Sequence, residues 1–208
     1  MKTFLFSIIA VLSLSLFAFG NSKAEMSVKD YFLAIPSEFI KASAAKRTAW
    51  IEQEDASIGY LAYTIPVKEL TGDEGEDSVW GALQVFEKKD GGVMIGMVNN
   101  LCADGECMGM MRFLDYKGGK FTDVSEDFLI IPDNDEVIKI LREAPAFENK
   151  SSLKDGEQVP LALQFNGNDK SVQFIAGCKK DCDGGVVAKQ YKWNGEAFIE
   201  FEDEVSPE

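Results

Sequence analysis

Five short segments occur twice along this chain, in the same order. Ala82-Leu83-Gln84-Val85 recurs at 162–165, and the apolar run from Val93 recurs from Val172, each run leading into a pair of cysteines. The other matched segments are 32–36 with 128–132, 111–116 with 188–193, and 121–124 with 198–201. The spacing within pairs drifts, from 96 residues at Pro36/Pro132 to 77 at Phe121/Phe198, as expected when loop lengths differ. We interpret this series as an internal duplication; the alternative is a chance likeness between two antiparallel meanders.

Each of the two series of segments predicts a helix followed by several strands. A helix is predicted to open at Pro36, with apolar positions near a 3.6-residue period up to Trp50. A second helix is predicted after Pro132, whose acidic first turn at 133–136 suits a helix N-terminus, and Pro145 ends it. Turns containing Gly or Asn then follow at intervals of about 8–12 residues, which is typical of an antiparallel meander.

These patterns predict an α+β protein made of two similar helix-plus-antiparallel-meander units, each with a disulfide-stapled hairpin. The first unit is expected over residues 25–126 and the second over residues 127–208, packed together as one domain.

Residues 1–20 have the pattern of a signal peptide. Lys2 supplies a positive start, and an apolar run interrupted only by serines extends from Phe4 to Phe19. Cleavage is expected after Gly20, with Ala24 as the alternative. A membrane anchor is the competing interpretation, because the run approaches the about 17 residues that begin to span a bilayer. No basic cluster follows the run, so we expect a periplasmic or secreted protein without a membrane span.

The charge balance excludes several classes of function. There are 21 Lys and Arg against 35 Asp and Glu, a net charge of −14, and such a field repels the phosphates of nucleic acids. The chain contains no His, which excludes Ser-His and Cys-His nucleophiles and His-based metal sites. We therefore expect a protein that is not an enzyme and that carries no metal or cofactor.

Four cysteines lie in the mature part of the chain: Cys102, Cys107, Cys178 and Cys182. In an oxidising compartment an even number predicts disulfides, and the short spacings favour Cys102–Cys107 and Cys178–Cys182 among three possible pairings. Each bond would close a hairpin tip and contribute about 2 kcal/mol. A four-cysteine zinc site and a redox-active pair are the alternatives, but neither has its usual C-x-x-C spacing.

The two stapled loops are the predicted partner-binding elements, because a closed loop loses little entropy on binding. Their candidate contact residues are Asp104, Gly105 and Glu106 in the first loop, and Lys179, Lys180 and Asp181 in the second. The acidic charge would attract a basic partner. Five methionines crowd the first loop, at 94, 97, 108, 110 and 111. Core packing is the favoured interpretation for them, and an adaptable apolar contact surface is the alternative.

Residues 176–182, Ala-Gly-Cys-Lys-Lys-Asp-Cys, resemble one element of the bacterial inhibitor of vertebrate lysozyme family. Members of that family insert a disulfide-closed Cys-Lys-Pro-His-Asp-Cys loop from an antiparallel sheet into the lysozyme cleft. Cys178, Lys179, Asp181 and Cys182 match, whereas Lys180 stands in place of Pro-His, so the inserted His is missing. The resemblance implies a basic, lysozyme-like hydrolase as partner. The Trp-Asn-Gly ending from Trp193 also resembles small exported bacterial proteins without assigned activity.

Three functions are compatible with these observations. The favoured one is an exported acidic binding protein, an inhibitor of a basic secreted hydrolase being its sharpest form. A carboxylate-dependent hydrolase with a groove between the two units is the first alternative, and it needs a partly buried Asp/Glu pair. A structural, envelope-associated protein is the second.

Overall fold

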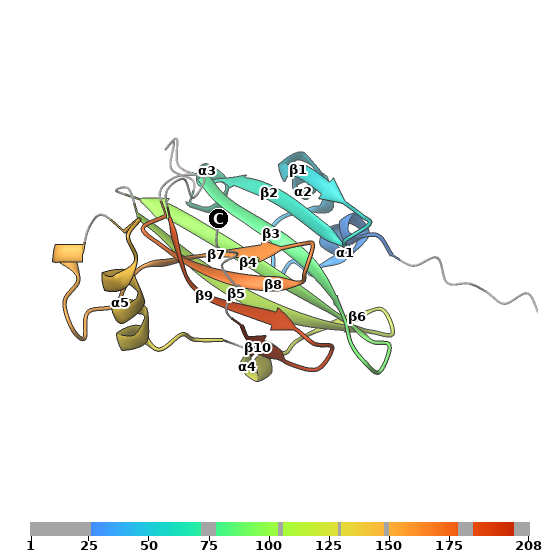
Figure 1. The fold of residues 1–208 in the computed structure, drawn as a ribbon. Coiled ribbons are helices and arrows are strands. Elements are labelled where there is room, and N and C mark those ends of the chain that lie inside the picture. The colour runs from blue at the N-terminus through green and yellow to red at the C-terminus, as the bar shows by residue number, and fades with distance from the viewer. Residues whose placement is uncertain are drawn as a thin grey trace, which may run out of the picture.

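The computed structural model of this chain describes residues 26–71, 78–103, 106–128, 130–147, 150–178 and 185–201. These residues form two antiparallel sheets with short helices around them, which confirms the α+β class (Figure 1). The predicted signal peptide lies outside the described residues. In the part that is described, no helix is long and apolar enough to cross a membrane.

The larger sheet is a meander of six strands in chain order. Its strands are β1 (Ile51–Asp55), β2 (Tyr60–Pro66), β3 (Ser78–Glu87), β4 (Val93–Ala103), β5 (Glu106–Lys117) and β6 (Lys120–Asp123). The predicted glycine turn closes the β5–β6 hairpin, where Gly118 and Gly119 have φ angles of 60° and 83°. Two successive positive φ angles match the twist of a two-residue hairpin, and glycine adopts them without strain.

The smaller sheet has four strands in the order β10-β9-β8-β7. They are β7 (Leu161–Asn166), β8 (Ser171–Ala176), β9 (Val186–Trp193) and β10 (Phe198–Glu200). The helices of the chain are α1 (Val28–Ala34), α2 (Ala44–Trp50), α3 (Lys68–Thr71), α4 (Ser125–Phe128) and α5 (Asn134–Glu143), with a 3-10 turn at Lys150–Ser152.

The helix predicted from Pro36 to Trp50 is confirmed over Ala44–Trp50, and its predicted start at Pro36 is wrong. The chain instead forms α1, which the sequence interpretation missed, then a turn at 37–39, then α2. Ser27 and Asp30 cap α1 reciprocally: the N–H of Asp30 donates to Ser27 Oγ at 3.1 Å, and the N–H of Ser27 donates to Asp30 Oδ2 at 2.9 Å. The apolar residues keep their helical spacing from Pro36 to Trp50 even though the chain turns at 37–39. They do so because both helices and the turn bury side chains against the same face of the sheet.

The helix predicted after Pro132 is confirmed as α5. Asp133 is its N-cap, and its Oδ1 accepts from the N–H of Glu136 at 2.9 Å. Val137, Ile138 and Leu141 form its buried face, and the helix ends before Pro145.

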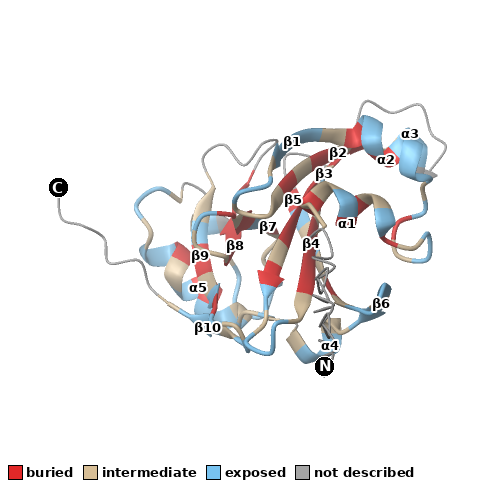
Figure 2. Ribbon diagram, turned by 90° about the vertical axis from the view of Figure 1, so that its right-hand side faces the viewer, coloured by how far each residue is buried: buried red, intermediate tan, exposed pale blue. Residues whose placement is uncertain are grey.

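Two large cores lie on opposite faces of the six-stranded sheet. On one face, α1 and α2 pack over Tyr63, Leu83 and Leu114. On the other face, the four-stranded sheet packs over β3, β4 and β5, so that the buried positions run along the central strands (Figure 2). Aromatic rings fill this second core. Phe86 contacts Phe113, Phe165, Trp193 and Phe198 edge-on, and Phe198 also forms tilted pairs with Phe113 and Trp193.

A buried side-chain amide on β4 bonds directly to the backbone of the smaller sheet. Asn100 on β4 is fully buried; its Nδ2 donates to the carbonyl of Leu163 at 2.8 Å, and its Oδ1 accepts from the N–H of Leu163 at 2.6 Å. The side-chain amide of Asn100 thus bonds both backbone groups of Leu163, as the backbone of a neighbouring strand would. Close approach is possible because Gly109 lies opposite Asn100 on β5, where a Cβ would come within 2.5 Å of Leu163 Cγ.

The segments that recur in the sequence lie on successive strands of the two sheets: β3 with β7, β4 with β8, β5 with β9, and β6 with β10. The sheets nevertheless differ in size, and the matched leucines have different surroundings. Leu83 packs beneath the helices, whereas Leu163 packs between the sheets. Internal duplication therefore stays a prediction.

Candidate functional site

The first predicted disulfide is confirmed. Cys102 on β4 and Cys107 on β5 are bonded and lie directly opposite each other in the strand register. The indole N–H of Trp80 donates to Cys102 Sγ at 3.4 Å. Cys178 is buried and is not a free thiol, but Cys182 lies outside the described residues, so the second pairing stays a prediction.

The predicted partner-binding loops themselves cannot be placed. Asp104, Gly105, Lys179, Lys180 and Asp181 lie outside the described residues, and Glu106 is described only as the first residue of β5. The bases of both loops can be placed: Cys102, Cys107 and Cys178 belong to one apolar cluster, together with Ala162 and Ile175. The structure therefore brings together two cysteine sites that are distant in the sequence.

Removing the first disulfide is expected to destabilise the protein only moderately. A variant with Cys102→Ser and Cys107→Ser should lose about 2 kcal/mol of unfolding free energy, because so short a loop restricts the unfolded chain little. Urea denaturation followed by tryptophan fluorescence measures the loss. A variant that no longer folds would contradict this account and make the bond essential to the fold.

An apolar groove of about 720 Å³ runs beside β5. One wall is formed by Met108, Met110 and Met111 of β5 with Met97 of β4, and the other by residues 130–132 and 158–161. Sequence reasoning missed this site, because the segments that face β5 follow it by about 20 to 50 positions and have no recognisable motif.

The outer edge of β5 is open beside this groove. β6 pairs with β5 only from Leu114 to Lys117. At Phe113 the edge is still occupied, because the N–H of Val124 donates to its carbonyl at 3.0 Å and its N–H donates to Ser125 Oγ at 2.9 Å. Of the strands that the structure describes, only β4 pairs with β5 before that point. Since strand residues alternate, Gly109 and Met111 direct their N–H and C=O groups outward as Phe113 does.

Two methionines lie exposed along this stretch of β5. Met108 is 59% exposed and Met110 is 64% exposed, and Leu101, opposite Met108, is 44% exposed. Met94 and Met97 are buried. The core interpretation of the methionines is therefore confirmed for Met94 and Met97 and wrong for Met108 and Met110, which form an apolar surface.

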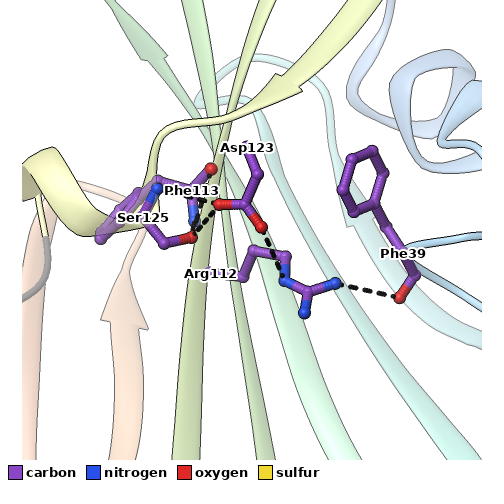
Figure 3. A network of polar contacts seen from close by, with 5 residues as sticks. All are labelled: Phe39, Arg112, Phe113, Asp123 and Ser125. Carbon is purple, nitrogen blue, oxygen red and sulfur yellow. Dashed lines mark hydrogen bonds and ion pairs between the residues drawn. The ribbon is translucent and has the colours of Figure 1, made fainter.

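Among the described residues that line the groove, Arg112 is the one that carries a charge. Its guanidinium lies over the ring of Phe39, with Cζ 5.5 Å from the ring centre (Figure 3). Its two polar contacts are both long: Nε lies 3.5 Å from Asp123 Oδ2, and Nη1 lies 3.5 Å from the carbonyl oxygen of Phe39.

Asp123 is held mainly by Ser125. Its Oδ1 accepts from the N–H of Ser125 at 2.9 Å and from Ser125 Oγ at 2.5 Å. Partial burial works to raise the pKa of Asp123, but the hydrogen bonds from Ser125 and the charge of Arg112 outweigh it and lower the pKa. Asp123 therefore stays ionised, with its Oδ1 bonded to Ser125 and its Oδ2 facing Arg112.

A second charged cluster is structural. Lys189 on β9 is buried and pairs with Glu136 of α5 at 2.6 Å and with Glu200 of β10. Burial works to lower the pKa of Lys189, but the two carboxylates raise it above its ordinary value. The charged lysine thus ties α5 to the four-stranded sheet.

The hydrolase alternative, which needs a partly buried Asp/Glu pair, stays a hypothesis for the described part of the chain. No Asp or Glu there is buried, and none lines the groove beside β5. The same residues contain no group of three His, Cys, Asp or Glu side chains that could hold a metal ion.

Neither a family model nor a curated protein matches this sequence. Among solved structures, the chain is similar to a domain of an uncharacterized protein from Porphyromonas gingivalis W83, with a TM-score of 0.50 and 11% identity. The match covers 84% of this chain and 97% of that one. At this identity the likeness shows a shared fold.

Proposed function

We propose that this chain is an exported, non-enzymatic binding protein, and that its groove beside β5 takes an extended, mainly apolar peptide segment by strand addition. One observation carries the proposal: the outer edge of β5 from Met108 to Arg112, which no described strand pairs, lies directly along an apolar groove. An open edge is a template for another chain, and folded proteins usually cover or charge such edges. Here the edge carries two exposed methionines instead.

The dimensions of the edge suit a short peptide. From Met108 to Arg112 the strand spans about 14 Å, at about 3.4 Å per residue, which corresponds to four or five residues of an added strand. The outward N–H and C=O groups of Gly109 and Met111 would bond its backbone. Its alternate side chains would lie against Met108 and Met110 or enter the groove, as in other complexes formed by strand addition. Methionine adapts to varied side chains at such a surface.

The groove favours an apolar partner over a basic one. Although the chain carries a net charge of −14, the only charge among the described residues that line the groove is the positive Arg112. Attraction of a basic hydrolase would therefore have to act through the two cysteine loops, and the lysozyme-inhibitor hypothesis has no support from the groove. Export is likewise part of this proposal and depends on residues 1–20.

Anisotropy of a fluorescein-labelled peptide tests strand addition. The probe is an eight-residue peptide of alternating Val and Thr, and its control has proline at the fourth and sixth positions, which removes two N–H donors and disfavours pairing. We expect micromolar binding of the first peptide and at least tenfold weaker binding of the second. Equal binding of both, or binding of neither, would contradict the proposal.

Two surface variants locate the binding on the molecule. Met110→Asp places a carboxylate on the exposed edge, and we expect it to weaken binding of the Val/Thr peptide at least tenfold. Ile199→Asp is the matched control, because Ile199 is also an exposed apolar strand residue but lies on β10 of the other sheet. Loss of binding in both variants, or in Ile199→Asp alone, would place the site elsewhere. A dimer that Met110→Asp dissociates, found by sedimentation, would assign the edge to a second copy.

A further inference from the structure

We propose that the groove recognises a free C-terminal carboxylate, which Arg112 binds, at the end of a peptide that runs parallel to β5. This inference depends on the proposed strand addition and specifies which peptides are taken. It follows from where the open edge stops, from the charge at that point, and from the contacts that Arg112 makes.

The open edge ends at Arg112. Phe113 already uses its outward N–H and C=O groups in hydrogen bonds with Ser125 and Val124, and β6 occupies the edge from Leu114 onward. A peptide added along β5 therefore cannot continue as a strand beyond Arg112. A peptide that terminates at this point uses the whole edge without having to turn away from the sheet.

Arg112 is positioned to receive an anion there. Its contacts with Asp123 and with the carbonyl of Phe39 are both at 3.5 Å, and within the described part of the chain its Nη2 has no partner. The aromatic ring of Phe39 holds the guanidinium plane in place. Ser125 bonds Oδ1 of Asp123, and the Asp123 side chain is 43% exposed, so water can solvate its Oδ2 when the guanidinium shifts toward an incoming carboxylate. A carboxylate matches the guanidinium fork and forms two charge-assisted bonds.

The position of this charge also sets the direction of the peptide. β5 runs from Glu106 toward Lys117, so Arg112 lies at the C-terminal end of its open stretch. A parallel peptide places its carboxylate at Arg112. An antiparallel peptide would place its positive amino terminus there, and the two like charges would repel each other.

Three versions of the Val/Thr peptide distinguish recognition of a terminal carboxylate from attraction of any negative charge. The first has a free C-terminal acid, the second a C-terminal amide, and the third a C-terminal amide with an internal Asp in place of one Thr; the fluorophore is attached at the amino end of each. We expect the free acid to bind about ten- to a hundredfold more tightly than the amide, the range of a charge-assisted hydrogen bond. If the internal Asp restores the affinity of the free acid, recognition of the terminus is overturned.

Arg112→Gln should remove the preference for the acid, so that the acid and the amide bind with equal affinity. The matched control is Arg142→Gln, since Arg142 on α5 is 44% exposed against 40% for Arg112 and does not line the groove. Circular dichroism checks that both variants remain folded. A preference for the acid that survives Arg112→Gln, or that Arg142→Gln also abolishes, would overturn the role of Arg112.

The failure of this inference is distinct from the failure of the proposed function. Equal binding of acid and amide, with Met110→Asp still weakening both, leaves strand addition intact and removes only the carboxylate site. Binding of neither peptide to the wild-type protein removes the proposed function itself, and the carboxylate site with it.

Discussion

Replacing Asn100 with leucine is expected to lower the free energy of unfolding by about 3–5 kcal/mol. Asn100 is fully buried, and its amide satisfies both the N–H and the carbonyl of Leu163 across the two sheets. Leucine has nearly the same volume and neither donates nor accepts, so both backbone groups would be left unpaired in the interior. Each unpaired buried group costs about 1–3 kcal/mol.

Asn99→Leu is the matched control on the same strand. Its Oδ1 accepts one hydrogen bond from the Tyr63 hydroxyl at 2.8 Å, and that hydroxyl also lies 3.4 Å from the carbonyl oxygen of Val98. We expect a loss of about 1 kcal/mol for this variant. Urea denaturation measures both changes, and amide hydrogen exchange should accelerate at Leu163 in Asn100→Leu alone. If Asn100→Leu costs no more than Asn99→Leu, the amide does not hold the sheets together.

Replacing Arg47 is expected to have an effect of similar size. The Arg47 side chain is buried beneath the turn between α1 and α2, and its guanidinium donates to the carbonyl oxygens of residues 32, 35, 40 and 42. Two of these carbonyls, that of Phe32 in the last turn of α1 and that of Ile35 just after it, have no N–H partner within that helix. Arg47→Met should lower the free energy of unfolding by about 3–5 kcal/mol, because several buried carbonyls would lose their donor.

Arg47→Lys separates geometry from charge. Burial lowers the pKa of Arg47, yet a guanidinium stays protonated in proteins. A lysine keeps the charge, but one ammonium group cannot reach carbonyls that surround a planar fork, so we expect most of the loss to remain. The control is Lys46→Met in the same helix, where the exposed Lys46–Glu69 pair should contribute less than about 1 kcal/mol. Stability regained in full by Arg47→Lys would contradict this geometric account. If Arg47→Met does not fold at all, a comparison of the unfolding free energies of Arg47→Lys and Lys46→Met still tests the geometric account.

The parts of the fold that sequence reasoning predicted correctly depend on neighbours along the chain. The Asp133 cap and the spacing of Val137 and Leu141 specify α5 within about one turn of sequence. The Cys102–Cys107 bond closes a turn of four residues, so its spacing was sufficient to predict it. The predicted helix start at Pro36 was wrong because the turn at 37–39 packs on the same sheet face as α1 and α2, so the apolar period continues through the turn.

The candidate site was less predictable than the strands that form it. That the methionines of β5 would be apolar strand residues could be predicted, but not which of them would be covered. Coverage depends on where α1 and α2 end over one face of the sheet and where β6 stops pairing at Leu114. The positive charge at the groove could not be predicted either, because nothing in the sequence distinguishes Arg112 from the other 20 basic residues of a strongly acidic chain.

The amino-acid sequence by itself determined the α+β class, the helix α5, the hairpin turns and the first disulfide of this protein, since each depends on contacts within a few residues. Only the tertiary structure decided that the two sheets pack through Asn100 and Leu163, that the cysteine sites share one cluster, and that β5 keeps an open edge beside an apolar groove. The physical reason is that an edge is open or covered according to what the rest of the chain places beside it. Here the segments that decide it are 124–125, 130–132 and 158–161. They lie beside β5 in space but are too far from it in sequence for a local pattern to reveal.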